Sequence, residues 1–197
     1  MLAHLRSALS LTILFTALTG LAYPLVLTGL AQGLFPAAAN GSLVLRDHTV
    51  IGSALVAQPF EGAGYLHPRP SASGWNAGGT GASNLGPTSA ALIATVAERR
   101  AAWEAKTGRS APIDAVTASG SGLDPDISPE NALAQAGRIA AARGVDIGAV
   151  SRLIEAATLG RTLWLFGEPR VNVLETNLAL DAAFPGPGAG GQGTPTQ

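Results

Sequence analysis

The chain of 197 residues contains no cysteine and only one lysine, Lys106. Without cysteine, disulfides, thiolate metal sites and a cysteine nucleophile are excluded. A phosphate-binding P-loop requires GxxxxGK followed by Ser or Thr, and the residues before Lys106 do not supply it. The segment Lys106-Thr107-Gly108 cannot be the phosphorylation motif of a cation pump, because Ala105 replaces the aspartate. It cannot serve a serine β-lactamase either, because such enzymes need a second lysine.

Charge is also scarce. Charged residues make up 13% of the chain, about half the usual share, and the net charge is −1. No basic field therefore exists to bind nucleic acid through counterion release. The 3 histidines are scattered, with no pair at i, i+4, so we predict no zinc site and no bound metal. Ser119 stands where the first glycine of a GxSxG nucleophile turn would be, which argues against a serine hydrolase.

The hydrophobic residues, 47% of the chain, are concentrated near the amino terminus. Residues 9–30, LSLTILFTALTGLAYPLVLTGL, are 22 uncharged positions, enough for a helix to span the ~30 Å hydrocarbon core. Eleven of them are Leu, Ile, Phe or Val, which favours insertion by roughly 3–7 kcal/mol. We predict an amino-terminal segment, residues 1–35, that contains this transmembrane helix. A signal peptide cleaved near Ala39 is the alternative, although its hydrophobic stretch is usually about 7–15 residues long.

The flanking charges and the small residues of the span predict its placement. His4 and Arg6 precede the span and the next arginine is Arg46, so the positive-inside rule predicts a cytoplasmic amino terminus. Small and hydroxyl residues recur every four positions and allow another helix to approach closely. Pro24 lies in this series and should kink the helix. The series is Ala8, Thr12, Thr16, Gly20, Pro24 and Thr28.

The sequence predicts an α+β class, with a small mixed domain over residues 36–184 after the helix. The expected β elements are a hairpin within 42–57, a strand at 113–117, and a strand pair at 162–166 and 171–177. The expected helices are 89–107, one capped by Ser128 that ends before Gly144, one from Asp146 to before Gly160, and 178–184. The low-complexity tail, residues 185–197, should be disordered. Residues 65–89, rich in glycine, are predicted to form an ordered recognition loop.

Residues 116–132, VTASGSGLDPDISPENA, admit several kinds of chemistry. The backbone of SGSG could bind an anion, and Asp124, Asp126 and Glu130 could be proposed as a calcium site. Turn and capping roles explain the residues better, because the glycines permit left-handed backbone and Asp124 before a proline starts a turn. The stretch therefore predicts a rigid connection of specified shape.

Three segments carry a family resemblance: RPSASGWNAGGTGASNLGPT, VTASGSGLDPDISPENALAQAGRIAAARG and GEPRVNVLETNLAL. With the single amino-terminal span, they resemble the C subunit of the Kdp-type potassium-transporting ATPase of bacteria, over nearly the whole chain to about residue 183. Asp126 departs from the histidine expected in many relatives. The resemblance implies a bacterial inner-membrane protein that crosses once, with its main domain extracytoplasmic. It implies an accessory subunit that supports assembly and activity of a P-type ATPase subunit and raises that subunit's ATP affinity.

The implied partners are a channel-like potassium-binding subunit, the P-type ATPase catalytic subunit and a small single-span subunit. ATP and potassium would be handled by the complex, and we expect this chain to bind no cofactor firmly. A membrane-anchored enzyme using Ser119 or Ser121, or a secreted ligand-binding domain, are the alternatives. The residues expected to bind partners or set the shape are Thr12, Thr16, Gly20, Arg69, Trp75, Asn76, Asn84, Gly86, Ser119, Gly120, Ser121, Gly122, Asp124, Ser128 and Arg138.

Overall fold

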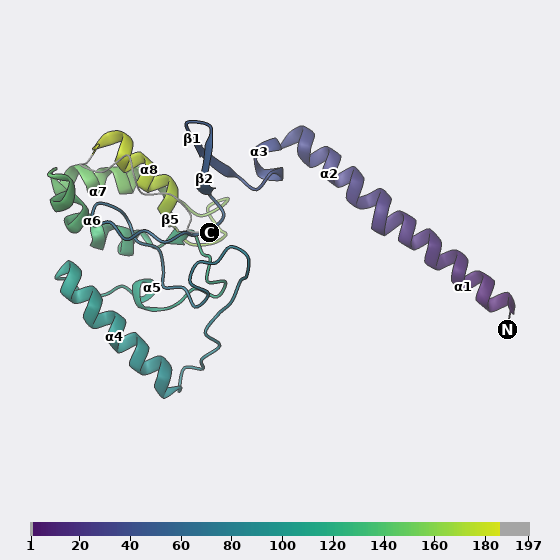
Figure 1. Ribbon diagram of the computed structural model, residues 1–197, viewed down its shortest axis with the longest axis horizontal. Coiled ribbons are helices and arrows are strands. Elements are labelled where there is room, and N and C mark those ends of the chain that lie inside the picture. The colour runs from purple at the N-terminus through teal and green to yellow at the C-terminus, as the bar shows by residue number, and fades with distance from the viewer. Residues whose placement is uncertain (1, 186–197) are drawn as a thin grey trace. The chain divides into compact units, whose positions relative to one another are not determined.

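The computed structural model describes residues 2–185 as a mixture of helices and short strands (Figure 1). The chain divides into two units that meet between Leu43 and Val44. One apolar helix makes up most of the first unit, and the second unit combines five helices with two small sheets. This mixture, preceded by a single apolar helix, agrees with the predicted α+β class.

The first unit is a long helix with an irregular middle. It consists of α1 (Leu2–Phe15), the π-helical η1 (Thr16–Ala22) and α2 (Tyr23–Leu34), followed by the short α3 (Pro36–Ala39). The stretch His4–Leu34 is 31 residues long, and its most apolar 18-residue window has a mean hydropathy of 1.8, so its length and composition suffice to cross a membrane. None of that window is buried. The π-helical turns lie immediately before Pro24, which lacks the N–H that an α-helix would use there. The helix is thus irregular on the amino-terminal side of Pro24, and the kink expected at Pro24 stays a prediction.

The second unit begins with a hairpin, as the sequence predicts. Strand β1 (Leu43–Arg46) pairs with β2 (Thr49–Ser53). The connecting residues Asp47 and His48 have φ of 51° and 65°. Two successive positive φ values are typical of the tight turns whose twist matches that of the flanking strands.

A three-stranded sheet joins segments that are far apart in the sequence. It contains β3 (Asp126–Ile127), β4 (Thr158–Leu159) and β5 (Arg170–Asn172), in the order β3-β5-β4. Both pairings are antiparallel, and Val171 of the central strand lies opposite Ile127 on one side and Thr158 on the other. Val171 is fully buried, so the middle of this sheet belongs to the core.

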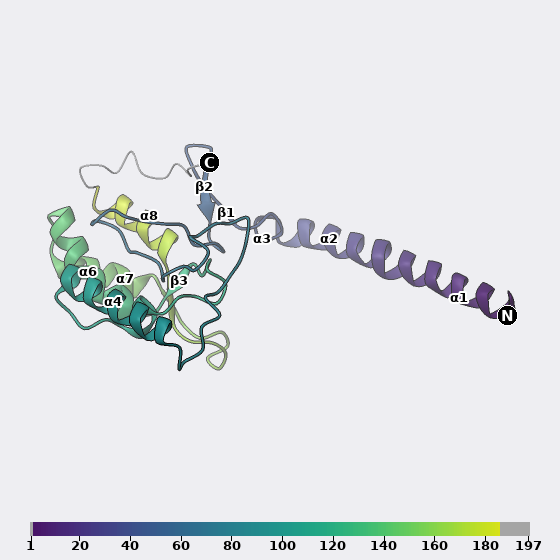
Figure 2. The ribbon, with the colours of Figure 1, turned by 60° about the horizontal axis from the view of Figure 1, so that its bottom comes forward.

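Helices supply the rest of the core. They are α4 (Ala90–Thr107), α5 (Ile113–Val116), α6 (Pro129–Arg143), α7 (Ile147–Ala156) and α8 (Val173–Ala183). Helix α6 packs on α7, α7 on α8, and α4 runs beside α6, as Figure 2 shows from a second side. The fully buried side chains at the centre include Leu66, Ile139, Val150, Ile154 and Leu180.

Side-chain caps explain where these helices begin. The side chains of Ser128, Asp146 and Asn172 accept hydrogen bonds from backbone N–H groups three residues further on. Helices α4 and α6 end at Gly108 and Gly144, whose φ of 64° and 67° suit glycine at a helix end. The expected ends at these two glycines and the cap at Ser128 are therefore confirmed.

Two strand predictions are wrong, and the one at 171–177 holds only for Val171 and Asn172, which are in β5. Residues 113–116 form α5, which Pro112 precedes with a φ of −60°. Residues 173–177 belong to α8, because the Asn172 side chain caps a helix there, and a short apolar run does not distinguish a buried strand from a buried helix. Residues 162–166 form a tight turn, with positive φ at Leu163 and Trp164. The region before Gly160 contains β4 after α7, and the predicted disordered tail lies outside the described residues beyond Pro185.

Candidate functional site

Two irregular segments, residues 69–81 and 118–124, are hydrogen-bonded to each other, and we call them the two-loop platform. The Ser119 N–H donates to the carbonyl of Pro70 (3.1 Å), and the Gly81 N–H donates to the carbonyl of Ser121 (2.8 Å). The Ser71 hydroxyl donates to the carbonyl of Gly122 (2.7 Å). Both glycine-rich segments that the sequence singled out therefore form one structure.

Gly122 is buried where the two loops are closest. Its φ is +71°, a conformation that other residues adopt only with strain. A Cβ at this position would collide with the hydroxyl oxygen of Ser73 and lie 2.8 Å from the carbonyl oxygen of Gly81. Gly120 differs, since it is exposed and a Cβ there would meet nothing within 4 Å. The close approach of the loops thus requires glycine at position 122.

An ion pair between Arg69 and Asp124 connects the loops (2.9 Å). The same guanidinium lies 3.5 Å from the carbonyl of Ala118, while its Nε is buried and has no hydrogen-bond partner. The other Asp124 oxygen accepts from the N–H of Asp126 (3.1 Å), which forms the turn expected before the proline. Asp124 therefore has a structural role in both loops.

The exposed edge of this region carries several of the predicted contact residues. Trp75 is half-buried with a φ of 56°, and its N–H donates to the Ser71 hydroxyl (3.0 Å). The Asn76 side chain accepts from the N–H of Gly78 (2.9 Å) and is exposed. Asn84, with a φ of 52°, and Gly86 are exposed beyond the platform. Both residues lie outside the two-loop platform, and their role in partner contact stays a prediction.

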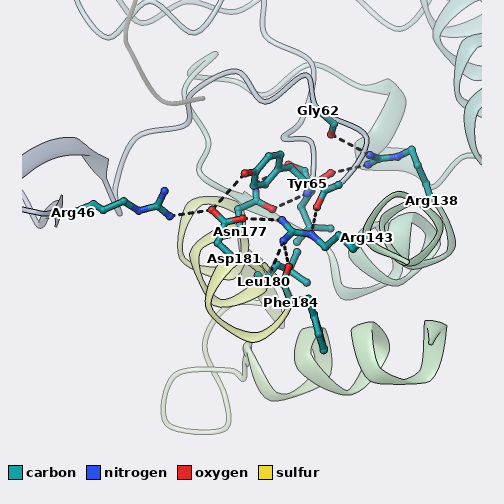
Figure 3. Close-up of polar contacts among 11 residues, drawn as sticks. Arg46, Gly62, Tyr65, Arg138, Arg143, Asn177, Leu180, Asp181 and Phe184 are labelled. Atoms are coloured by element: carbon teal, nitrogen blue, oxygen red, sulfur yellow. Dashed lines mark hydrogen bonds and ion pairs between the residues drawn. The ribbon is translucent and has the colours of Figure 1, made fainter. Parts of the chain in front are cut away.

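Ser128 and Arg138 set the shape of the domain. The Asp114 carboxylate accepts from both the N–H (2.7 Å) and the hydroxyl (3.0 Å) of Ser128, so the cap of α6 is itself held from α5. Arg138 donates to the carbonyls of Ala63 (2.6 Å) and Tyr65 (2.9 Å). Figure 3 shows Arg138 beside Tyr65 and Gly62. Burial lowers the pKa of Arg138 to about 10, which still leaves it charged at neutral pH.

The sequence analysis missed a second arginine, Arg143, at the end of α6. Its side chain is 4% exposed and donates to the carbonyls of Gly64 (2.7 Å) and Phe184 (2.7 Å) and to the carboxylate of Asp181 (2.9 Å), as shown in Figure 3. Its guanidinium also lies 4.9 Å from the centre of the Tyr65 ring. No local sequence signal identifies such a residue, because its hydrogen-bond partners lie 37 to 79 positions away in the chain.

The hydroxyl, imidazole and carboxyl groups near the platform are buried or hydrogen-bonded, which fits structural roles better than catalytic ones. The Ser121 hydroxyl oxygen accepts from the N–H of Leu123 (3.0 Å), and Ser119 is buried. His67 lies with its Nε2 3.1 Å from the carbonyl of Gly62, and burial, aided by Arg138, lowers its pKa to about 4. Burial raises the pKa of Asp126, which pairs with Arg170 (3.0 Å). Within residues 2–185, no group of three or more potential ligands could hold a metal ion.

The predicted helix-packing residues lie in the first unit. Thr12 is in α1, and Thr16 and Gly20 are in η1. A Cβ at Gly20 would lie 3.9 Å from the Cγ2 of Thr16, so the two residues remain neighbours despite the π-helical turns. All three are exposed in the chain by itself.

An exposed apolar helix long enough to cross a bilayer, joined to a small α+β domain, fits a membrane-associated protein. Comparison with known proteins specifies the family. The family model "K+-transporting ATPase, c chain" matches residues 5–182, so the chain belongs to this family.

Curated relatives agree over nearly their full length. The chain is 65% identical over 183 residues to the "Potassium-transporting ATPase KdpC subunit" of Cereibacter sphaeroides, covering 93% of this chain and 99% of that one. It is 56% identical over 190 residues to the protein of the same name from Rhodospirillum rubrum, covering 94% and 98%. The corresponding protein of Acidobacterium capsulatum is 54% identical over 180 residues, covering 90% and 97%.

Proposed function

We propose that this chain is a non-catalytic subunit of an ATP-driven, high-affinity potassium uptake complex, in which it supports assembly and activity of the P-type ATPase subunit. The observation that carries the proposal is the match over residues 5–182, which includes both the apolar helix and the two-loop platform. The partners are a channel-like potassium-binding subunit, the ATPase subunit and a small single-span subunit. ATP and potassium bind to those partners rather than firmly to this chain.

The helix is the anchor in this proposal. Thr12, Thr16 and Gly20 form a strip of small and hydroxyl side chains along which a partner helix can approach closely. The π-helical turns support a packing role, because such turns frequently occur at functional positions of helices. The proposed location of the chain is the bacterial inner membrane, which this helix crosses as a single span in the proposal.

The domain lies on the extracytoplasmic side in this proposal, because His4 and Arg6 precede the span and Arg46 is the next arginine. On that side, the edge of the two-loop platform at Trp75 and Asn76 contacts the outer surfaces of the partner subunits. ATP is cytoplasmic, so any increase in the ATP affinity of the catalytic subunit would be transmitted through the complex rather than made by contact. Labelling of a cysteine introduced at exposed Ser110 with a membrane-impermeant maleimide on intact cells tests this side, and protection until the cells are broken would refute it.

The decisive experiment disrupts the helix strip within the assembled complex. Gly20→Leu should release this chain from its partners during gentle detergent extraction and reduce potassium-stimulated ATP hydrolysis, because leucine fills the close approach. Gly33→Leu, in α2 and outside the four-residue series, is the matched control, since a Cβ there meets nothing within 4 Å. Full co-purification and transport by the Gly20→Leu complex would overturn the packing role. An unchanged KM for ATP after removal of this chain would overturn the proposed effect on ATP affinity.

A further inference from the structure

The turn at residues 162–166 exposes four consecutive large apolar side chains. Leu163, Trp164, Leu165 and Phe166 have exposed fractions of 78%, 95%, 72% and 60%. Leucine, tryptophan and phenylalanine side chains scattered singly on a surface need no explanation, but a contiguous apolar group marks an interaction site. The position in the fold is the connection between β4 and β5.

The backbone holds these side chains outward. The N–H of Thr162 donates to the carbonyl of Phe166 (2.8 Å), and the N–H of Phe166 donates back (2.9 Å). The positive φ of Leu163 (52°) and Trp164 (64°) makes the turn tight. Non-glycine residues seldom adopt this conformation, so its occurrence at two adjacent bulky residues indicates a constraint related to function.

Hydrogen bonds within the turn also satisfy backbone N–H groups that would otherwise need water. The N–H of Trp164 donates to Arg161 (3.3 Å) and that of Leu165 to Thr162 (3.2 Å), so four of the five amides in 162–166 are satisfied within the turn. An unsatisfied backbone group costs several kcal/mol in hydrocarbon, and the internal bonds remove this cost for those four amides. The nearest charges, Arg161 and Glu168, pair with each other (2.7 Å) at the base of the turn. The tip itself carries no charge.

The covalent connection keeps a membrane within reach of this turn. Only residues 35–42 connect the end of α2 to β1, and they span at most about 30 Å when extended. A domain of this size is itself roughly 40 Å across. The start of the domain therefore stays within about 30 Å of the bilayer surface once the helix is inserted, whichever side of the membrane it occupies.

We propose that the 162–166 turn inserts into the interfacial region of the lipid bilayer and is a second membrane contact of the chain. Tryptophan is enriched at this depth, where its ring is apolar and its indole N–H reaches the headgroups. Leucine and phenylalanine accompany it in segments that bury their apolar side roughly 5–10 Å below the headgroups. A lipid surface suits a narrow, convex apolar tip, because it adapts its shape to the tip and needs no complementary pocket. The contact fixes how the domain is oriented on the membrane.

The test places a fluorophore on the turn of the full-length chain in vesicles. The natural sequence has no cysteine, so Leu165→Cys gives a single attachment point for an environment-sensitive NBD group. Ile113→Cys, on α5 and 80% exposed, is the matched control, because it is an equally exposed apolar residue elsewhere on the domain. The vesicles contain phosphatidylethanolamine and phosphatidylglycerol, with or without lipids that carry a nitroxide near the headgroup.

At position 165 we expect a blue-shifted emission that the nitroxide lipids reduce by about half, as for a group at the interface, and neither effect at position 113. Emission at 165 like that of the control would overturn the proposal. A blue shift that appears only in the intact multi-subunit complex, without quenching by the nitroxide lipids, would also overturn it and assign the turn to a protein partner. Because both variants alter exposed side chains, near-wild-type unfolding curves provide the check that each is folded.

Discussion

Replacing Gly122 with alanine tests whether the two-loop platform depends on the close approach of its loops. The substitution adds one methyl group at a buried position with a φ of +71°. The methyl group would collide with the Ser73 hydroxyl and lie 2.8 Å from the Gly81 carbonyl oxygen. The hydroxyl can rotate away, but the carbonyl belongs to backbone and can move only if the loop moves.

The expected cost follows from these contacts. A left-handed backbone costs alanine about 1–2 kcal/mol relative to glycine. Displacing Gly81 also weakens the hydrogen bond from its N–H to Ser121 (2.8 Å), worth about 1 kcal/mol. We therefore expect Gly122→Ala to lower the free energy of unfolding by about 2–3 kcal/mol.

Two other glycines separate the contributions. Gly74→Ala carries the strain of a positive φ (63°) without any contact within 4 Å, and Gly120→Ala carries neither. We expect a loss of about 1–2 kcal/mol for Gly74→Ala and a change within about 0.5 kcal/mol for Gly120→Ala.

The assay is urea unfolding of the full-length chain in detergent micelles, followed by tryptophan fluorescence, since Trp75 lies in the platform. Equal stabilities of Gly122→Ala and Gly120→Ala would refute the reasoning.

Two further predictions concern Arg143 and His67, whose side chains contact the carbonyls of residues 62–65. Arg143→Met should lower the free energy of unfolding by about 3–4 kcal/mol, because it leaves buried carbonyls without their donor and Asp181 with the more exposed Arg46 as its remaining cation. Arg161→Met removes an exposed ion pair and should cost less than about 1 kcal/mol, and similar urea midpoints for the two variants would contradict this. His67 has a pKa lowered to about 4, so its contribution is fully present above about pH 6.5, where the unfolded imidazole is neutral, and is lost as the pH falls toward 4. Allowing for partial exposure, the loss is about 2 kcal/mol. His67→Asn should remove this part of the acid dependence in unfolding curves measured from pH 7 to 4, and an unchanged acid dependence would count against it.

Local signals in the sequence were sufficient for much of the fold. The apolar run, the hairpin turn at Asp47 and His48, the cap at Ser128 and the helix ends at Gly108 and Gly144 are all determined by neighbouring residues, and each is found in the structure. In every case the physical cause lies within a few positions. Such features can be predicted without knowledge of the tertiary contacts.

The wrong predictions share a different cause. The run VNVLETN is apolar and β-branched, which is typical of a strand, but only its first two residues are in β5. The Asn172 side chain accepts from the N–H of Glu175 (3.0 Å) and begins a helix whose buried face packs into the core. A residue that is both the end of a strand and the cap of a helix cannot be recognised from apolar periodicity alone.

The sequence predicted which segments form the candidate site, but it did not predict which residues of the two segments contact each other. The sequence identified both glycine-rich segments, and Gly122 among them, from their turn residues. It could not show that Gly81 meets Ser121, or that Arg69 pairs with Asp124 across 55 positions. Those contacts depend on how the core places the loops.

The platform needs that core, because its own hydrogen bonds are too weak to order it. Six hydrogen bonds join the loops, including the Arg69–Asp124 ion pair, and each contributes about 1 kcal/mol net. Fixing the backbone of roughly twenty loop residues costs about 1–2 kcal/mol for each residue, which is far more than these bonds supply. The difference must come from buried apolar side chains at the base of the loops, where Leu66, Val116 and Leu123 lie, and from the N–H of Ala57, which donates to the Leu123 carbonyl (2.9 Å). Because burial rather than a partner fixes the backbone, the exposed edge at Trp75 and Asn76 has its shape before any subunit arrives. In the complex that we propose, a partner subunit recognises this edge with little ordering cost.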